Sequence, residues 1–502
     1  MELIFSRGLL ALYYLILGIL AFYGLHRMAM VALYYRTRSR SIPPPPDPEQ
    51  WPTVTVQLPL FNEMYVARRL IDAICALDYP RDRLEIQVLD DSTDPTKEIV
   101  ARQVVHYRRR GYQIHHIQRC RRTGFKAGAL AAGLQRARGS LLAVFDADFV
   151  PRSDFLKRTV PYFADPKLGM VQARWDHINR RYSLLTRIQA ILLDGHFVIE
   201  HAARNRGGRF FNFNGTAGIW RRQAILDAGG WQHDTLTEDL DLSYRAQLAG
   251  WKFLFLPEVT VPAELPVDIN GFKGQQFRWA KGSIQTARKL LGRILRAPIP
   301  WRVKLEAFVH LTNNMSYLLM VFLSLLIFPA MVLRSGTDVH ILLLVDLPLF
   351  LGATVSVLVF YVVSQVAANP DWRRDLRHLP SLMGLGIGLA INNSRAVLQG
   401  LVDRGGVFER TPKYRIEAPH DGWREKRYRV RRNPSFALEA TLATYFVLCV
   451  VAAWKLEMWL SLPFLYLFLQ GYCYMTLLSL LPDRPAADPG LPAGMDGKAV
   501  GT

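Results

Sequence analysis

Cysteine is scarce in this chain, with only four residues among 502. Cys75, Cys120, Cys449 and Cys473 are scattered, and no two of them form a CxxC pair. This pattern argues against a disulfide framework and against a cysteine-based zinc site. Internal repeats are also absent. A chain of this length is too long for one compact core, so we expect two or three domains.

Acidic residues are the minority among the charged ones, with 42 Asp and Glu against 62 Lys and Arg. The resulting formal net charge of +20 is compatible with nucleic-acid binding. The basic residues cluster beside apolar segments, however, as in membrane proteins whose Lys and Arg crowd the cytoplasmic side. We therefore expect no nucleic-acid partner, and a basic face that attracts a small anionic ligand.

Long apolar segments are abundant, since half of the residues are hydrophobic and they are concentrated rather than spread. Residues 9–33 are long enough to cross a bilayer as a helix. A cleaved signal peptide is the alternative, but few positive charges precede the segment and Arg36, Arg38 and Arg40 follow it. That flank places the next domain in the cytoplasm. Four further spans are expected at 308–333, 342–367, 438–454 and 460–480.

Two other stretches are expected to lie at the membrane surface. If residues 379–402 crossed the bilayer, the basic loop that begins at Arg404 would lie outside, against the positive-inside tendency. Asn392, Asn393 and Arg395 would also be costly in lipid. Residues 281–296 have a basic amphipathic pattern just before an apolar span, which favours an interfacial helix over a plain surface helix. We predict a multi-pass integral membrane protein with five spans, in the plasma membrane if its source is bacterial.

The segment between the first and second spans has the pattern of an α/β domain. Pro43 to Pro46 form a stiff spacer before it. Strands are expected at 53–59, 85–90, 113–118 and 141–146, and helices at 63–76, 96–110 and 126–138. This alternation predicts a doubly wound domain with a mainly parallel sheet. Ligands of such sheets bind beyond the carboxyl ends of the strands.

Asp146 and Asp148 follow the last of these strands. Two carboxylates at a strand end can hold a hard divalent cation, Mg²⁺ or Mn²⁺, which bridges to the diphosphate of a nucleotide-sugar. The cation would ease departure of the nucleoside diphosphate. A solvated turn or a helix cap is the structural alternative, because the DxD pattern is common.

Three residues near other strand ends are candidates for nucleotide binding. Asp91 lies in the run DDSTD, which equally fits an Asx-turn and a helix cap. Glu63 follows the first strand and is placed to do similar work. Lys126 opens a helix, where a cation and free amides suit phosphate, although it could be a plain surface lysine.

A carboxylate at the start of a later helix is the candidate catalytic base. Glu238 and Asp239 follow Thr237, and acidic residues are favoured in a first helical turn for structural reasons alone. In the functional interpretation, Asp239 removes the proton of an acceptor hydroxyl as its oxygen attacks the anomeric carbon. One base opposite a metal-held leaving group implies direct displacement with inversion.

Gln275, Arg278 and Trp279 are spaced to share one helix face. Trp279 can stack on a sugar ring, while Gln275 and Arg278 can bind hydroxyls or a diphosphate. A buried tryptophan with an arginine over it is the structural alternative.

Together these motifs resemble the processive, membrane-embedded family-2 glycosyltransferases of the cellulose-synthase-like superfamily. The resemblance extends over about residues 51–413, and QxxRW with upstream DD, DxD and TED is a highly specific combination. Longer stretches are similar to plant glucomannan and xyloglucan-backbone synthases: 87–94 (QVLDDSTD), 145–149 (FDADF), 171–175 (VQARW) and 213–218 (FNGTAG).

The resemblance implies a GT-A type glycosyltransferase domain inserted between transmembrane helices, with interfacial amphipathic helices. It implies that Glu63, Asp91, Lys126 and Asp146 bind the nucleotide-sugar, that Asp146 and Asp148 hold the metal, and that Asp239 is the base. Asn214, Gly215, Thr216, Glu238, Gln275, Arg278 and Trp279 would contact the donor and the growing polysaccharide. Residues 408–413 (FERTPK) correspond to a mobile loop of the family, usually FxVTxK, with Arg410 in place of valine and Pro412 added.

The chain also departs from parts of that superfamily. It lacks the zinc-binding N-terminus of plant cellulose synthases, and its C-terminal chain is too short for a cyclic-dinucleotide-binding domain. The expected boundaries are 1–42 (first span and basic flank), 43–280 (cytoplasmic catalytic domain), 281–304 (interfacial helix), 305–368 (two spans), 369–435 (interfacial or re-entrant segment and basic loop), 436–482 (two spans) and 483–502 (disordered tail).

The leading hypothesis is a processive synthase that elongates a β-1,4-glucan, a β-mannan or a glucomannan and passes it across the membrane. A single-addition glycolipid synthase, such as a ceramide or diacylglycerol glucosyltransferase, shares the aspartates and a related QxxRW element. A catalytically inactive basic scaffold is a third possibility, which the intact motif set argues against. The motifs do not distinguish UDP-glucose from GDP-mannose as the donor.

Overall fold

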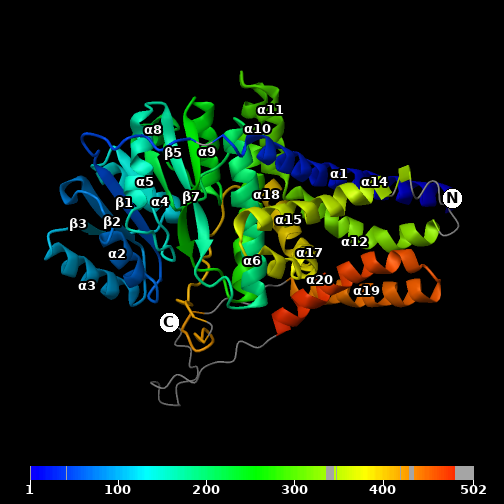
Figure 1. The fold of residues 1–502 in the computed structure, drawn as a ribbon. Helices are drawn as coiled ribbons and strands as arrows, with labels where there is room; N and C mark the ends of the chain where they lie inside the picture. Colours follow the sequence, from blue (N-terminus) through cyan, green and yellow to red (C-terminus); the bar gives the residue numbers. More distant parts are fainter. Residues whose placement is uncertain are drawn as a thin grey trace, which may run out of the picture.

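An α/β domain lies beside a bundle of long apolar helices (Figure 1). The computed structural model describes residues 2–40, 42–334, 344–345, 347–418, 420–428 and 435–480. The tail expected at 483–502 lies outside the described residues. So do Arg429, Arg431 and Arg432 of the basic loop, and a few residues of the span expected at 342–367.

A seven-stranded sheet forms the centre of the α/β domain, in the order β3-β2-β1-β4-β6-β5-β7. The strands are β1 (Val54–Leu60), β2 (Leu84–Asp90), β3 (Gln113–Ile117), β4 (Leu141–Val144), β5 (Leu168–His177), β6 (Gly218–Arg221) and β7 (Lys252–Ala263). Only β6 runs antiparallel to its neighbours. The prediction of a mainly parallel, doubly wound sheet is confirmed.

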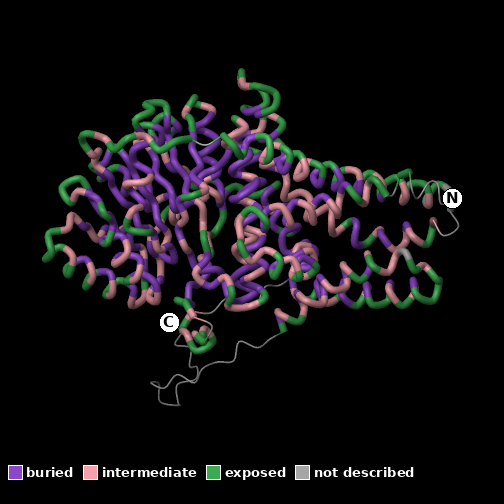
Figure 2. Tube along the Cα trace, in the orientation of Figure 1, coloured by how far each residue is buried: buried purple, intermediate pink, exposed green. Residues whose placement is uncertain are grey.

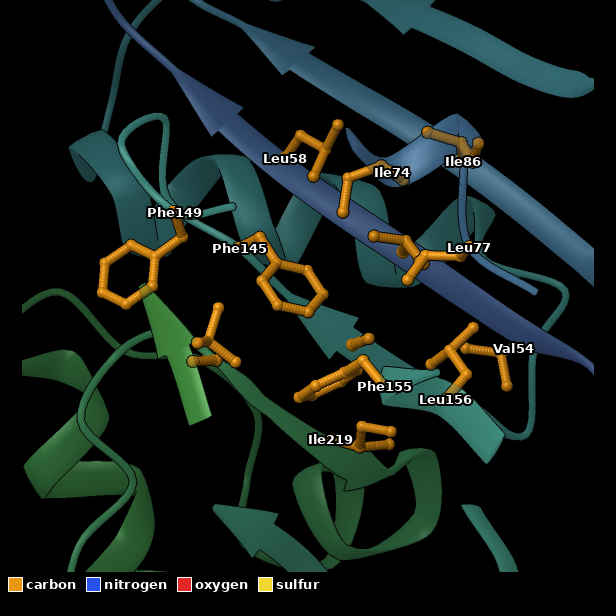
Figure 3. Close-up of a cluster of buried hydrophobic side chains, with 14 of the residues drawn as sticks. Val54, Leu58, Ile74, Leu77, Ile86, Phe145, Phe149, Phe155, Leu156 and Ile219 are labelled. Carbon is orange, nitrogen blue, oxygen red and sulfur yellow. The ribbon is translucent and has the colours of Figure 1, made fainter. Parts of the chain in front are cut away.

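The sheet is buried on both faces, and residues coloured as buried run through its centre (Figure 2). Cover on both sides leaves β2 with no exposed residue, and this includes its polar Glu85, Gln87 and Asp90. Helices α2 (Ala67–Cys75) and α3 (Thr96–Arg108) pack on one face, where Leu58, Ile74 and Phe145 meet (Figure 3). Helices α4 (Phe125–Arg136) and α9 (Glu238–Leu248) pack on the other face.

The strand order reverses beside β1, and this reversal positions the functional residues. The chain builds β1, β2 and β3 toward one edge and then returns to place β4 on the opposite side of β1. Ligands of open α/β sheets bind at such a switch point, outside the carboxyl ends of the strands. Glu63, Asp91 and Asp146 follow the ends of β1, β2 and β4, so they converge there.

Five helices among the described residues are long and apolar enough to cross a membrane. They cover Ser6–Thr37 of α1 (Glu2–Thr37), α12 (Met315–Leu333), Leu347–Ala368 (α14 to α15), α19 (Phe436–Lys455) and α20 (Leu462–Leu480). They coincide with the five segments expected to span. Large apolar side chains such as Leu15, Leu448 and Leu477 are more than 60% exposed, which suits contact with lipid rather than water. The protein is thus a membrane protein.

The QxxRW motif and the amphipathic stretch after it form one helix, α10 (Ile269–Arg296), where the sequence suggested a break at residue 281. Ile284, Leu290 and Ile294 are buried where α10 packs against its neighbours, which include α9 and α11 (Trp301–Thr312), whereas Leu295 is 46% exposed. Phe308 belongs to α11, so the second span begins later than expected, at Met315.

Residues 379–402 form two short helices, α17 (Leu379–Gly388) and α18 (Ala390–Val402). Helix α18 packs along α10 and α12. The amide of Asn392 donates a hydrogen bond to the carbonyl oxygen of Lys273 at 3.0 Å. Asn392 and Asn393 are thus enclosed by protein, whereas Arg395 is exposed.

Candidate functional site

The sequence motifs meet at one cavity of about 190 Å³ at the carboxyl ends of the central strands, here called the motif pocket. It is lined by Glu63, Asp91, Lys126, Asp146, Asp148, Asn214, Gly215, Glu238, Asp239, Gln275, Arg278 and Trp279. Thr216 is the one site residue predicted from the sequence that does not line it. This side chain is fully buried, and its Oγ1 accepts a hydrogen bond from the backbone N–H of Asp146 at 2.9 Å. Thr216 therefore supports the end of β4 from behind.

Each aspartate of the DxD pair faces a lysine. Lys126 Nζ lies 2.5 Å from Asp146 Oδ1, and Lys413 Nζ lies 2.7 Å from Asp148 Oδ2. Lys126 also donates a hydrogen bond to the carbonyl oxygen of Gly215 at 3.0 Å. Burial raises the pKa of Asp146, with Lys126 opposing the rise. The pair is thus a concentrated negative charge that the protein neutralises with two cations.

The DxD pair fits a divalent cation that takes its other ligands from a substrate. Among the described residues, no group of three or more His, Cys, Asp or Glu side chains could hold a metal ion without help. Mg²⁺ is commonly bound through one or two carboxylates plus substrate phosphates, rather than by an all-protein cage. Asp146 and Asp148 meet this description, because each keeps a second carboxylate oxygen beside the one that faces its lysine.

Asp91 is held by an arginine that the sequence did not single out. The guanidinium of Arg119 donates to both carboxylate oxygens, through Nε at 3.0 Å and through Nη2. This bidentate pair fixes the carboxylate at the rim of the motif pocket. Asp91 can therefore accept hydrogen bonds from a ligand only through its remaining lone pairs.

Glu63 lies opposite Arg410, with Oε2 and Nη1 3.2 Å apart as an ion pair without hydrogen-bond geometry. Burial raises the pKa of Glu63 to about 8, although Arg410 opposes this. Arg410 also lies over the ring of Tyr428, 3.9 Å from its centroid. The residue that replaces valine in the FxVTxK pattern is thus part of the pocket wall.

Asp239 lies in the first turn of α9, and its Oδ1 accepts a hydrogen bond from the N–H of Leu240 at 2.8 Å. Burial and the neighbouring Glu238 raise the pKa of Asp239 to about 7. Gly215 packs against it with φ +81°, and a Cβ at that position would lie 3.0 Å from Asp239 Oδ2. The candidate base is thus half-buried and suited to accept a proton near neutral pH.

The QxxRW helix and residues 408–413 close the pocket together. Arg278 donates to Thr411 Oγ1 at 2.8 Å and to the carbonyl oxygen of Glu409, and it lies over the ring of Phe408. Burial lowers the pKa of Arg278 to about 10. The segment expected as a mobile loop therefore lies over the pocket, where it contributes Phe408, Arg410, Thr411 and Lys413.

A second cavity of about 290 Å³, here called the polar cavity, continues from the motif pocket. The two share Asn214, Asp239, Gln275 and Trp279 among their lining residues. The polar cavity is also lined by charged and polar side chains that the sequence did not indicate, among them His26, His196, Glu200, Arg204, Gln276 and His310. Only the fold brings His26, Gln276 and His310 against the helical run that carries His196, Glu200 and Arg204 at a spacing of four residues.

A third cavity of about 380 Å³, the membrane cavity, lies among the apolar helices. It shares Arg27, Asn313, Asn314, Tyr317 and Tyr361 with the polar cavity. Its remaining lining is largely apolar, with residues of α1, α12 and α20 such as Leu17, Ile327 and Phe468. The three cavities thus run in series from the sheet to the helical bundle.

Residues 52–282 match the family model "Glycosyltransferase like family 2". The chain is 38% identical over 319 residues to "Glucomannan 4-beta-mannosyltransferase 1" of Cyamopsis tetragonoloba, covering 62% of this chain and 60% of the relative. It is 46% identical over 251 residues to "Glucomannan 4-beta-mannosyltransferase 2" of Arabidopsis thaliana, covering 49% and 47%. The matches thus span roughly half the length of these relatives.

Among solved structures, the chain is similar to the mannosyltransferase PcManGT from Pyrobaculum calidifontis, solved with GDP-Man and Mn²⁺. The TM-score is 0.52 at 20% sequence identity, over 76% of this chain and 99% of that one. At this identity the likeness concerns the fold, which is that of a glycosyltransferase of the GT-A kind.

Fold, motifs and matches define the class of protein: residues 52–282 are a family-2 glycosyltransferase domain, set among membrane helices. The resemblance drawn from the motifs is confirmed over the part of the chain that matches these glucomannan 4-beta-mannosyltransferases.

Proposed function

We propose that the chain is an inverting hexosyltransferase that elongates a β-linked polysaccharide from a nucleotide-sugar and passes it across the membrane. The continuity of the three cavities carries this proposal. Asp239 and Trp279 line both the motif pocket and the polar cavity, so the bond-forming position lies at their junction. A sugar added there has a path onward through the polar cavity into the membrane cavity.

Asp239 acts as the base. Its ionised carboxylate accepts the proton of the acceptor hydroxyl as that oxygen attacks the anomeric carbon, and the nucleoside diphosphate leaves from the opposite face. Lys126, between Asp146 and Gly215, holds a positive charge close to the departing diphosphate. Burial, the largest influence on the pKa of Lys126, lowers it. Asp146, Glu238 and Asp239 outweigh burial and raise the pKa, so the amine stays charged.

Asp146 and Asp148 hold a divalent cation, Mg²⁺ or Mn²⁺, together with the donor diphosphate. When bound, the cation neutralises charge on the leaving group. The Mn²⁺ and GDP-Man of the structurally similar mannosyltransferase support this assignment. Glu63 and Asp91 line the same pocket and serve the nucleotide portion of the donor.

Gln275, Arg278 and Trp279 hold the donor and the acceptor, with Asn214, Gly215 and Glu238 beside them. These residues line the motif pocket from α10, α9 and the stretch before β6. Arg278 also anchors residues 408–413 through Thr411. Closure of this segment over the pocket excludes water, which protects the activated donor from hydrolysis.

GDP-mannose is the donor that the relatives favour, since both are named as β-mannosyltransferases. The product is then a β-1,4-mannan or a glucomannan. Basic residues that flank the first span, including Arg36 and Arg38, support a catalytic domain in the cytoplasm, where nucleotide-sugars are present. A single-addition glycolipid synthase is the alternative, and the relatives, which are named as glucomannan mannosyltransferases, favour the polymer over it.

The test measures sugar transfer by the full chain in vesicles, with radiolabelled GDP-mannose or UDP-glucose as the donor and either Mg²⁺ or Mn²⁺ present. We expect GDP-mannose to give an ethanol-insoluble product that an endo-β-1,4-mannanase degrades, with Asp239→Asn as the inactive control. Label found only in the organic-extractable lipid would overturn the polymerase proposal in favour of glycolipid synthesis. Polymer that accumulates only on the side of the catalytic domain would overturn translocation.

A further inference from the structure

His196 occupies an unusual place beside the proposed acceptor residues. It lies in a π-helical segment, η3 (Gly195–His201), between α6 (Leu184–Asp194) and α7 (Ala202–Arg206). Single π-helical turns within longer helices occur frequently at functional sites. One ring nitrogen, Nδ1, lies 3.2 Å from Glu200 Oε2, and the other, Nε2, lies 2.9 Å from Asn214 Nδ2.

The charge of Glu200 decides which nitrogen of His196 carries the proton. Glu200 also faces Arg204, whose Nη1 lies 3.4 Å from Oε2. Burial raises the pKa of Glu200, but Arg204 and His196 outweigh it and hold that pKa well below the ordinary value. A carboxylate only accepts hydrogen bonds. The proton of His196 therefore sits on Nδ1, and Nε2, which lies against the NH₂ group of Asn214, is an acceptor.

This tautomer in turn decides how the Asn214 amide is turned. Nε2 can only receive a hydrogen bond, so Asn214 presents its NH₂ group to His196 and keeps Oδ1 on the other side. Oδ1 is enclosed and has no hydrogen-bond partner among the described residues. An enclosed acceptor without a partner is unfavourable, and a ligand hydroxyl would relieve that cost.

The position of Asn214 shows which ligand is involved. Its side chain lines both the motif pocket and the polar cavity, and the next residue, Gly215, packs against Asp239. If the proposed function holds, the hydrogen-bond donor expected at this junction is a hydroxyl of the incoming acceptor sugar.

We propose that Glu200 and His196 are positioning residues that orient Asn214, so that its Oδ1 accepts a hydrogen bond from a hydroxyl of the acceptor sugar. His196 acts only through Asn214 and makes no contact with the donor nucleotide. The inference rests on the proposed function and adds a determinant of acceptor binding to it.

A double-mutant cycle in the full chain tests the proposal, with binding of labelled β-1,4-mannohexaose and binding of GDP-mannose measured separately. We expect His196→Leu and Asn214→Ala each to weaken hexaose binding about tenfold, or ~1.4 kcal/mol. The double variant should be no weaker than Asn214→Ala, because both changes remove one interaction. GDP-mannose binding should change by less than about twofold in all three variants.

Two further variants separate positioning from loss of folding. His196→Gln keeps an oxygen that can accept from Asn214 Nδ2, and should restore much of the hexaose binding. His106→Leu makes the same chemical change on an exposed face of α3 and should bind hexaose as the wild type does. Two outcomes would overturn the positioning role of His196 while leaving the proposed function intact. One is that the losses of hexaose binding in the two single variants add up in the double variant. The other is an equal loss of GDP-mannose binding. A wild-type protein that binds GDP-mannose but no hexaose would overturn the proposed function as well.

Discussion

Lys413 Nζ lies 2.7 Å from Asp148 Oδ2, so the last residue of segment 408–413 neutralises the second aspartate of the DxD pair. The same amine donates to the carbonyl oxygen of Glu264 at 3.0 Å. Because Lys126 does the equivalent for Asp146, a cation that binds both carboxylates must compete with two lysines. Segment 408–413, which closes the pocket, is therefore coupled by charge to the two carboxylates proposed to bind the metal.

Removing this counter-ion should strengthen metal binding in the absence of nucleotide. Lys413→Met leaves Asp148 buried without a cation, so we expect affinity for Mn²⁺ to rise about tenfold while sugar transfer falls. Thermal unfolding of the full chain with increasing MnCl₂ would measure this. Lys157→Met removes an exposed partner of Asp78 and should leave the metal response unchanged. An unaltered response in Lys413→Met would contradict the coupling.

Transfer should depend on the ionisation of Asp239, whose pKa is raised to about 7 by burial and by Glu238. A protonated Asp239 cannot accept a proton, so kcat/KM should rise with pH over roughly pH 6 to 8. Glu238→Gln removes the like charge and should move the midpoint of the profile downward. Asp239→Asn should lower kcat by about 10²–10⁴-fold at every pH. A profile unchanged by Glu238→Gln would remove Asp239 as its source.

Gly215→Ala should damage activity more than stability. Both Gly215 (φ +81°) and Gly111 (φ +82°) adopt a left-handed conformation that costs an alanine about 1–2 kcal/mol. A Cβ at Gly215 would also lie 3.0 Å from Asp239 Oδ2, whereas nothing lies within 4 Å of one at Gly111. We expect similar losses of thermal midpoint in the two variants, but a roughly 10–100-fold loss of transfer only for Gly215→Ala. If Gly215→Ala and Gly111→Ala transferred sugar equally well, Asp239 would tolerate a Cβ at position 215.

A buried ion pair joins the QxxRW helix to the last two membrane helices. Lys273 Nζ lies 2.6 Å from Glu439 Oε2, both side chains are fully buried, and Ser479 accepts a second hydrogen bond from Lys273. Lys273→Met alone should lower stability by about 3–5 kcal/mol, because Glu439 is left buried without a partner. Combining it with Glu439→Leu should recover most of the loss, read as the thermal midpoint in detergent. A double variant as unstable as Lys273→Met would show that shape, rather than charge, determines the cost.

The sheet was predictable because its strands are buried on both faces and alternate with helices of ordinary length. The strand predicted at 85–90 differs from β2 by one residue at its start and ends, as β2 does, at Asp90. The continuity of α10 was not predictable, since the amphipathic pattern after residue 281 reads equally well as a separate helix. In the structure the helix continues unbroken from Ile269 to Arg296, and α9 and α11 cover part of its apolar side at Ala287, Leu290 and Ile294.

The residues with chemical motifs were predictable because carboxylates at strand ends of a parallel sheet converge by geometry. Thr216 does not line the pocket, although its neighbours Asn214 and Gly215 do. Its side chain lies behind the end of β4, where it accepts a hydrogen bond from the Asp146 N–H. No motif marks Arg119 or His196, and Arg410 is marked only as the residue that replaces valine in the FxVTxK pattern. They matter only because of what they face across the fold.

The amino-acid sequence by itself determined the class of protein, since apolar length sets the membrane helices and the spacing of acidic and QxxRW residues sets the family. Only the tertiary structure decided how charges and hydrogen bonds are paired: Lys413 on Asp148, Arg410 on Glu63, and the junction of the motif pocket and the polar cavity at Asp239. These pairings join residues far apart in the chain. Periodicity and spacing describe one segment at a time, so they carry no information about which distant groups will meet.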